Sequence, residues 1–330
     1  MHSIGSAHVP PNLMAHFNPN QFNRGCKYVI DLKPDEVSDD YVVTILLVRG
    51  CREGSTLVVT AGVHGDEFEG VRAIIDTYQS LDPNEMSGDF IGVPVANTPA
   101  FWNGTRNSPI DGLNLARVFP GALGCGPTPA LAHALANSVI GWADFFVDLH
   151  SGGVKLLMPT MVGYDAADSR SRAAALVFGA EVAWGHPKIT AGRTIAFAKE
   201  QGIPWLYTEA RGAGRIDGDD LRVFVAGLRN VLRHLAILPG DIEAAEPRIH
   251  LYGEGDTDAA VLAHHRGFLI PEVELLEKIT FGSDLGRTVN LRGETIEEFF
   301  APSDGILVMI RAWPVVEPGD SLFLLTEPAQ

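Results

Sequence analysis

A histidine and a glutamate that follow an apolar run are the residues of this chain best suited to metal chemistry. Residues 57–61 are apolar or small and lead into Gly-Val-His64-Gly-Asp-Glu67, and a second apolar run at 145–149 leads into His150. Zinc sites that catalyse hydrolysis take three ligands from the protein and keep one position for water. The sequence therefore predicts that His64, Glu67 and His150 bind one zinc ion per chain.

The spacing of this pair is weak evidence by itself, because short His-x-x-Glu strings arise by chance in a chain of 330 residues. Its context favours the metal, since His64 and Glu67 lie where a predicted strand meets a predicted helix and His150 has a matching setting. The alternative is structural. Glu67 would then help to begin the helix, and both histidines would be hydrogen-bonded groups of the core.

A second candidate carboxylate, Glu209, ends the strand-like run at 203–208 and precedes the glycine-rich residues 210–214. In open α/β sheets, ligands bind at the carboxyl ends of the strands. A carboxylate there could take a proton from water and return it to the leaving nitrogen. The alternative is that Glu209 pairs with Arg211 or caps the next element.

The loop at 103–121 carries two arginines, Arg106 and Arg117, and has little apolar content. Guanidinium groups bind carboxylates in a bidentate manner and stabilise negative charge that develops on oxygen. The alternative is that both arginines pair with acids at the surface. The sequence has no phosphate-binding loop, no His-Glu-x-x-His string and no Gly-x-Ser-x-Gly string, so these other chemistries lose support.

The elements that must position these residues alternate between strand and helix. Strands are expected at 57–61, 90–95, 145–149 and 205–208, and helices at 67–80, 128–142, 169–183 and 219–235. This order predicts an α/β fold with a mostly parallel sheet and helices on both faces.

The pattern changes at residues 239–247, which contain two prolines and a glycine and are predicted to be a linker. Short strands with turn signals follow, at 248–252, 267–271, 288–291, 305–311 and 321–325. We therefore expect a catalytic domain at 1–240 and a smaller all-β domain at 248–330.

Composition limits the partners and the compartment. A net charge of −16 argues against nucleic acid, which requires a basic surface. No apolar run is long enough to cross a membrane, the N-terminal residues do not resemble a signal peptide, and the three cysteines form no Cys-x-x-Cys pair. We expect a cytoplasmic protein that binds a small molecule. Homo-oligomerisation is left open.

The ordered set of motifs resembles the succinylglutamate desuccinylase/aspartoacylase family, which is similar in fold to the zinc carboxypeptidases. The matching strings span much of the chain: His64-Gly-Asp-Glu67, Arg106, Asp111-Gly-Leu-Asn114-Leu-Ala-Arg117-Val-Phe-Pro-Gly, Asp148-Leu-His150-Ser-Gly and Thr208-Glu209. Two later strings, Ala301-Pro-Ser-Asp-Gly-Ile and Glu317-Pro-Gly-Asp320, look like the β-domain of that family.

The resemblance implies residue roles and an activity, the hydrolysis of an N-acyl amino acid. By this resemblance Arg106 polarises the scissile carbonyl and Glu209 is the general base. Arg117 holds the substrate carboxylate, and Asp111 and Asn114 are placed with it in the substrate site. His64, Glu67 and His150 are the family's zinc ligands.

One position departs from the family pattern. The family usually carries Asn immediately before this arginine, and here the residue is Ala116. A side-chain amide is therefore missing beside Arg117, so we expect a substrate other than an acyl aspartate or glutamate. The length and the β-domain look more like the ectoine-degradation type of deacetylase than the vertebrate-type aspartoacylase.

The expected function is thus a zinc-dependent amidohydrolase that deacylates a small N-acyl amino acid. One alternative is a metallocarboxypeptidase that acts on short peptides, which would release a C-terminal amino acid. Another is a non-catalytic protein that binds a carboxylate ligand in the same pocket, against which Glu209 argues.

Overall fold

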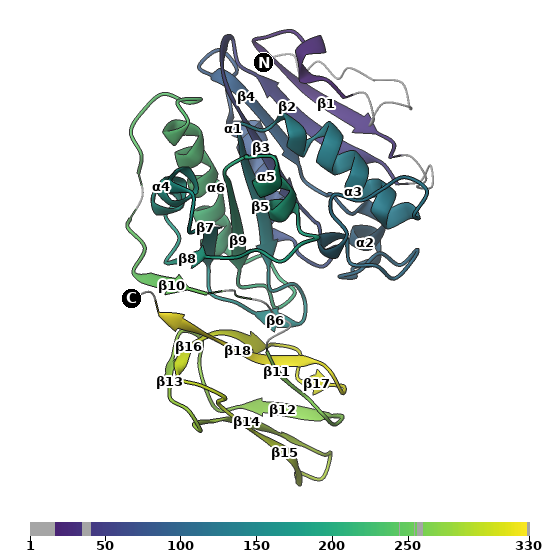
Figure 1. Cartoon of the computed structure of the whole chain (residues 1–330), viewed down its shortest axis with the longest axis vertical. Helices are drawn as coiled ribbons and strands as arrows, with labels where there is room; N and C mark the ends of the chain where they lie inside the picture. Colours follow the sequence, from purple (N-terminus) through teal and green to yellow (C-terminus); the bar gives the residue numbers. More distant parts are fainter. Residues whose placement is uncertain (1–16, 35–40, 244, 254, 256–259, 329–330) are drawn as a thin grey trace.

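The computed structural model describes residues 17–34, 41–243, 245–253, 255 and 260–328 (Figure 1). Residues 1–16 of the predicted catalytic domain and residue 244 of the predicted linker lie outside the described ranges. Within those ranges, no helix combines the length and the hydropathy needed to cross a bilayer.

A long mixed sheet forms the centre of the molecule. Its main strands before residue 240 are β1 (Cys26–Leu32), β2 (Val43–Arg49), β3 (Arg52–Ala61), β4 (Ser87–Val93), β5 (Phe145–Ser151), β7 (Met161–Asp165), β8 (Val182–His186) and β9 (Trp205–Ala210). Their spatial order is β1-β2-β4-β3-β5-β9-β7-β8. The run β4-β3-β5-β9 is parallel, whereas β1, β2 and β7 introduce antiparallel pairs. The predicted α/β class is confirmed.

Helices cover both faces of this sheet (Figure 1). They are α1 (Glu69–Ser80), α2 (Thr98–Asn103), α3 (Pro127–Ser138), α4 (Ser169–Phe178), α5 (Thr194–Glu200) and α6 (Gly218–His234). Local signals explain their ends. Asp217 caps α6 by accepting the backbone N–H of Asp219, and Pro127 opens α3, where no hydrogen-bond donor is needed.

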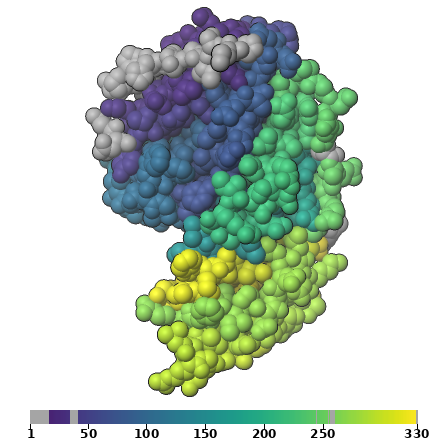
Figure 2. Space-filling model, turned by 180° about the vertical axis from the view of Figure 1, so that it is seen from behind, coloured from purple at the N-terminus to yellow at the C-terminus, as the bar shows by residue number. Residues whose placement is uncertain are grey.

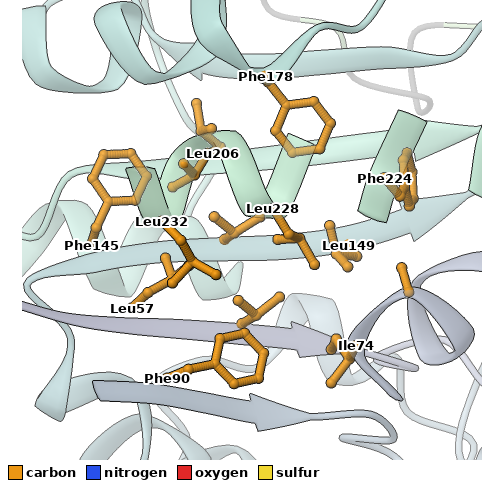
Figure 3. Close-up of a cluster of buried hydrophobic side chains, with 14 of the residues drawn as sticks. Leu57, Ile74, Phe90, Phe145, Leu149, Phe178, Leu206, Phe224, Leu228 and Leu232 are labelled. Atoms are coloured by element: carbon orange, nitrogen blue, oxygen red, sulfur yellow. The ribbon is translucent and has the colours of Figure 1, made fainter. Parts of the chain in front are cut away.

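The strands bury both of their faces, so alternate residues enter two different cores. On β5, Phe146 packs with residues of α3 and α5, whereas Phe145, Val147 and Leu149 pack with α1, α4 and α6. Figure 3 shows the second core, where Phe145 and Leu206 from the strands meet Leu228 and Leu232 of α6. The strands are therefore held firmly, and the residues at their ends are positioned by a packed layer on each side.

One predicted helix is too long, and its last two residues belong to a strand instead. The helix predicted at 169–183 ends at Phe178, because Gly179 adopts a left-handed conformation with φ 91°. Residues 182–186 form β8, which pairs in parallel with β7. The strands β7 and β8 and the helix α5 were not predicted.

The C-terminal strands lie below the main body in Figure 1 and form the light green to yellow lobe of Figure 2. They are β10 (Ile249–Tyr252), β11 (Val261–Leu262), β12 (Gly267–Pro271), β13 (Lys278–Ile279), β14 (Asp284–Val289), β15 (Thr295–Phe300), β16 (Gly305–Arg311), β17 (Val315–Val316) and β18 (Ser321–Pro328). Four of them form a separate sheet in the order β15-β14-β12-β17, which shares a hydrophobic core with β16 and β18.

The remaining C-terminal strands join the large sheet. β10 pairs with β8, and β18 and β16 continue from it. β16 also pairs with β6 (Leu156–Leu157), which belongs to the loop after β5. The large sheet therefore contains strands from both sides of the predicted linker, and the domain division at 239–247 stays a prediction.

Candidate active site

The register of β5 and β9 places two of the predicted site residues side by side. His150 is the direct neighbour of Glu209 on these parallel strands, and Asp148 is the neighbour of Tyr207. Residues two apart on a strand share a face. The four side chains therefore project from one face of the sheet at the carboxyl ends of its strands, with Leu149 in the core on the other side.

A close backbone contact brings the loop that carries Arg106 to the end of β3. A Cβ atom on Gly65 would lie 2.1 Å from the carbonyl carbon of Ala100, so only glycine fits there. The N–H of Gly65 donates to the carbonyl of Thr105 at 3.0 Å. As a result, Arg106 Nη1 lies 3.1 Å from Glu67 Oε1.

His64, Glu67 and His150 converge as metal ligands do. His64 Nδ1 lies 2.7 Å from Glu67 Oε1, and His150 Nδ1 lies 2.9 Å from Glu67 Oε2. The three ligand atoms are all within 4.8 Å of one another. Two imidazole nitrogens and a carboxylate are a donor set that zinc accepts, so the group fits a metal ion.

The outer nitrogen of His150 faces a buried carboxylate. Asp148 Oδ2 lies 3.0 Å from His150 Nε2, and Asp148 also accepts the hydroxyls of Thr60 and Thr194. An ionised carboxylate can only accept hydrogen bonds, so Nε2 of His150 carries the hydrogen. Once Nδ1 gives up its own proton, its lone pair can bind a cation beside Glu67.

The pKa values of the three groups follow from burial and from each other. Burial, with Arg106 nearby, lowers the pKa of His64 to about 4. Burial opposes the ionisation of Glu67, but His64 and His150 hold its pKa well below the usual value. Burial also opposes the charged form of His150, yet Asp148 and Glu67 raise its pKa well above the usual value. Metal binding at His150 would therefore release a proton.

Glu209 has the opposite surroundings. Burial, with the negative charge of Glu67 nearby, raises the pKa of Glu209 to about 8. Because a general base works best when its pKa is close to the working pH, this environment suits a group that takes and returns a proton.

A single cavity joins these groups to the rest of the predicted site. Its polar lining includes His64, His150, Arg106, Arg117, Arg193, Asp148 and Glu209, and its apolar lining includes Ala116, Met158, Trp184, Ile189, Ile195 and Leu324. Leu324 belongs to β18, so the C-terminal region contributes directly to the wall.

Asp111 and Asn114, both predicted to contact the substrate, have different hydrogen-bond partners. Asp111 accepts the backbone N–H and the hydroxyl of Thr128, at 3.1 and 2.8 Å, and so holds the start of α3. Neither Asp111 nor Asn114 is among the cavity-lining residues. Asn114 lies 3.2 Å from His64 Nε2. A direct contact of either residue with the substrate stays a prediction.

Several residues of the cavity had no role in the sequence-based prediction. Arg193 and Thr194 come from the start of α5, and Trp184 and His186 from the end of β8. The hydroxyl of Tyr207 lies 2.9 Å from His186 Nε2. The usable signal was the apolar run at 182–184 that ends in Gly-His, the same pattern that marked His150.

Comparison with known proteins agrees with these motifs. The profile of the succinylglutamate desuccinylase/aspartoacylase catalytic domain matches residues 53–235. The chain is 33% identical over 284 residues to the N-alpha-acetyl-L-2,4-diaminobutyric acid deacetylase of Halomonas elongata, covering 83% of each protein.

Solved structures show the same relationship. A succinylglutamate desuccinylase/aspartoacylase from Rhodobacter sphaeroides is 30% identical, with a TM-score of 0.79 over 88% of this chain and 90% of that one. The product-bound ectoine utilization protein EutE (DoeB) from Ruegeria pomeroyi is 27% identical, with a TM-score of 0.82 over 91% and 94%. The resemblance seen in the motifs, including that to the ectoine-type protein, is confirmed, and the chain belongs to the succinylglutamate desuccinylase/aspartoacylase family.

Proposed function

We propose that this protein is a zinc-dependent hydrolase that removes the acyl group from a small N-acyl amino acid. The observation that carries the proposal is the convergence of His64, Glu67 and His150 at a cavity whose lining includes both histidines, Glu209 and Arg106. The relative from Halomonas elongata is a deacetylase of an acetylated diamino acid, which supports the reaction type. In this proposal, one zinc ion per chain is held by the three converging residues.

When bound, zinc would polarise a carbonyl oxygen and make water more acidic. The residues of the chain supply the rest of the chemistry. Glu209 takes a proton from the attacking water and returns it to the leaving amine nitrogen. Arg106, whose side chain is 40% exposed, can turn its guanidinium group toward the negative charge that develops on the carbonyl oxygen. Arg117 binds the substrate carboxylate at the cavity wall.

The substrate we propose is an N-acetylated amino acid whose side chain is not acidic. Ala116 is buried beside Arg117 and lines the cavity, so this part of the wall offers a methyl group and no hydrogen bond. The name of the Halomonas elongata relative fits the same class, since diaminobutyrate has a basic side chain. The cytoplasmic location suggested by the cysteines stays a prediction.

The test is a panel of acetyl, formyl and succinyl amino acids together with dipeptides. Each would be given to the protein after chelation and again after zinc is restored. We expect zinc-dependent release of the free amino acid from acetylated substrates. Release of the C-terminal residue from dipeptides would identify a carboxypeptidase. Absence of zinc-dependent turnover across the panel would instead indicate a binding protein.

Replacing Ala116 with Asn should shift the substrate preference toward acidic acyl amino acids. The new amide restores a hydrogen bond to a charged group, an interaction worth about 1.5–3 kcal/mol, so the ratio of kcat/KM values should move roughly tenfold to a hundredfold. The ratio to measure is N-acetylaspartate against the best neutral or basic substrate, in both proteins. If the unmodified protein already prefers N-acetylaspartate, or the ratio does not move, position 116 does not determine specificity.

A further inference from the structure

Asn114 makes two hydrogen-bonding contacts through a single atom. Its Oδ1 accepts the backbone N–H of Ala116 at 2.9 Å and caps the short 3-10 helix Leu115–Arg117. The same Oδ1 lies 3.2 Å from Nε2 of His64, a residue 50 positions earlier in the chain. The side chain of Asn114 therefore connects the loop at 103–121 to His64, a residue of the proposed metal site.

The first contact determines which end of the amide faces His64. Because the backbone N–H of Ala116 can only donate, the atom opposite it must be the oxygen and not the NH2 group. An amide oxygen can only accept, so Asn114 is satisfied when the neutral His64 ring carries its hydrogen on Nε2. Its other nitrogen, Nδ1, lies 2.7 Å from Glu67 Oε1, and in this tautomer the lone pair of Nδ1 is available to a metal ion.

This arrangement opposes a competing one. In the other tautomer, the hydrogen would sit on Nδ1 and bind Glu67, which would occupy the nitrogen that has to face a metal. Asn114 favours the tautomer in which Nδ1 is available. His150 is arranged in the same way, with Asp148 in the place of Asn114, so both histidines have an acceptor at Nε2 and Glu67 at Nδ1.

We propose that Asn114 is a positioning residue of the metal site, which holds the hydrogen of His64 on Nε2 and so keeps Nδ1 available to the metal. The inference rests on the proposed metal-dependent function and gives Asn114 a role separate from contact with the substrate. Partners of this kind are typically worth 10–100-fold in metal affinity or activity.

The test measures the zinc Kd of the full-length protein by competition with a chromophoric chelator, without substrate. Asn114→Ala should raise the Kd about 10–100-fold. Asn114→Asp keeps both the oxygen and the cap, since Asp and Asn are equivalent caps. It also adds a negative charge that strengthens the bond from His64, so its Kd should equal that of the unmodified protein or fall below it.

Asn107→Ala is the matched control, because it removes the same side chain from the same loop. Asn107 is exposed and its amide donates to the carbonyl of Gly112 at 3.2 Å. Its zinc Kd should not change. A second readout is nitrogen-15 NMR of the His64 ring in the metal-free protein, where Asn114→Ala should reduce the share of the tautomer protonated on Nε2.

An Asn114→Ala protein with unchanged zinc Kd and impaired turnover would make Asn114 a substrate contact only, and would overturn the inference. An equal rise of the zinc Kd in Asn107→Ala would overturn the inference too, because a general disturbance of the loop at 103–121 would then explain both results. If Asn114→Ala does not fold, the Asn114→Asp protein decides. A zinc Kd tenfold higher than that of the unmodified protein would overturn the inference. If the unmodified protein binds no zinc, the proposed function fails. The NMR measurement still decides separately whether Asn114 holds the hydrogen of His64 on Nε2.

Discussion

Replacing Glu209 with Gln is expected to lower kcat by about 10²–10⁴-fold while the fold and the zinc content stay unchanged. The amide has nearly the shape of the carboxylate but cannot take a proton from water. Glu209 is the direct neighbour of His150 across β5 and β9, and its pKa is raised to about 8 by burial, with Glu67 nearby. Both observations place a proton-accepting group next to the proposed metal.

The measurements are steady-state kinetics on the best substrate of the panel, elemental analysis and circular dichroism. Glu200→Gln is the matched control, because Glu200 is an exposed residue at the end of α5, a helix that begins at the cavity. It should keep the kcat of the unmodified protein. A Glu209→Gln protein with nearly normal kcat would assign the base to another residue.

Replacing His150 with Ala is expected to remove both the bound zinc and the activity. In the proposed site His150 is one of three protein ligands, and without it Glu67 would lose one of the two imidazoles that lie within 3 Å of its oxygens. Two ligands cannot complete the three-ligand arrangement of a hydrolytic zinc site. Zinc per protein should fall well below one, and hydrolysis of the panel substrates should fall to background.

Elemental analysis after gel filtration, together with an activity assay, checks this result. His265→Ala is a suitable control, because the side chain of His265 is 65% exposed and contacts Glu297 in the C-terminal region. It should leave both the zinc content and the rate as they are. Full zinc content in the His150→Ala protein would remove His150 from the metal site.

The sequence by itself was enough to identify the strand ends whose polar residues His64, His150 and Glu209 line one cavity. Residues 57–61, 145–149 and 203–208 are apolar runs, and each leads into a polar residue of a type that binds metals or protons. These are local signals, because burial of a strand and the reactivity of a side chain are both readable over a few residues. The α/β class followed from the same alternation.

Local signals were insufficient where an apolar segment was short. The sequence of residues 182–186 is compatible with the end of a helix and with a strand. An apolar run this short does not distinguish the two. The pairing of β8 with β7 and β10 made it a strand and brought Trp184 and His186 into the cavity. Strand pairing depends on partners distant in the chain, so no short window of sequence contains it.

Only the tertiary structure decided which partners the polar side chains found. The sequence assigned Asp111 and Asn114 jointly to the substrate site, yet Asp111 binds Thr128 and Asn114 faces His64. Leu324 entered the cavity from β18, more than 100 residues after Glu209 in the chain. The sequence determined which groups are chemically able to act. Packing of the sheet and its loops determined which atoms meet, because register and side-chain contacts between distant segments arise only when the whole core is assembled.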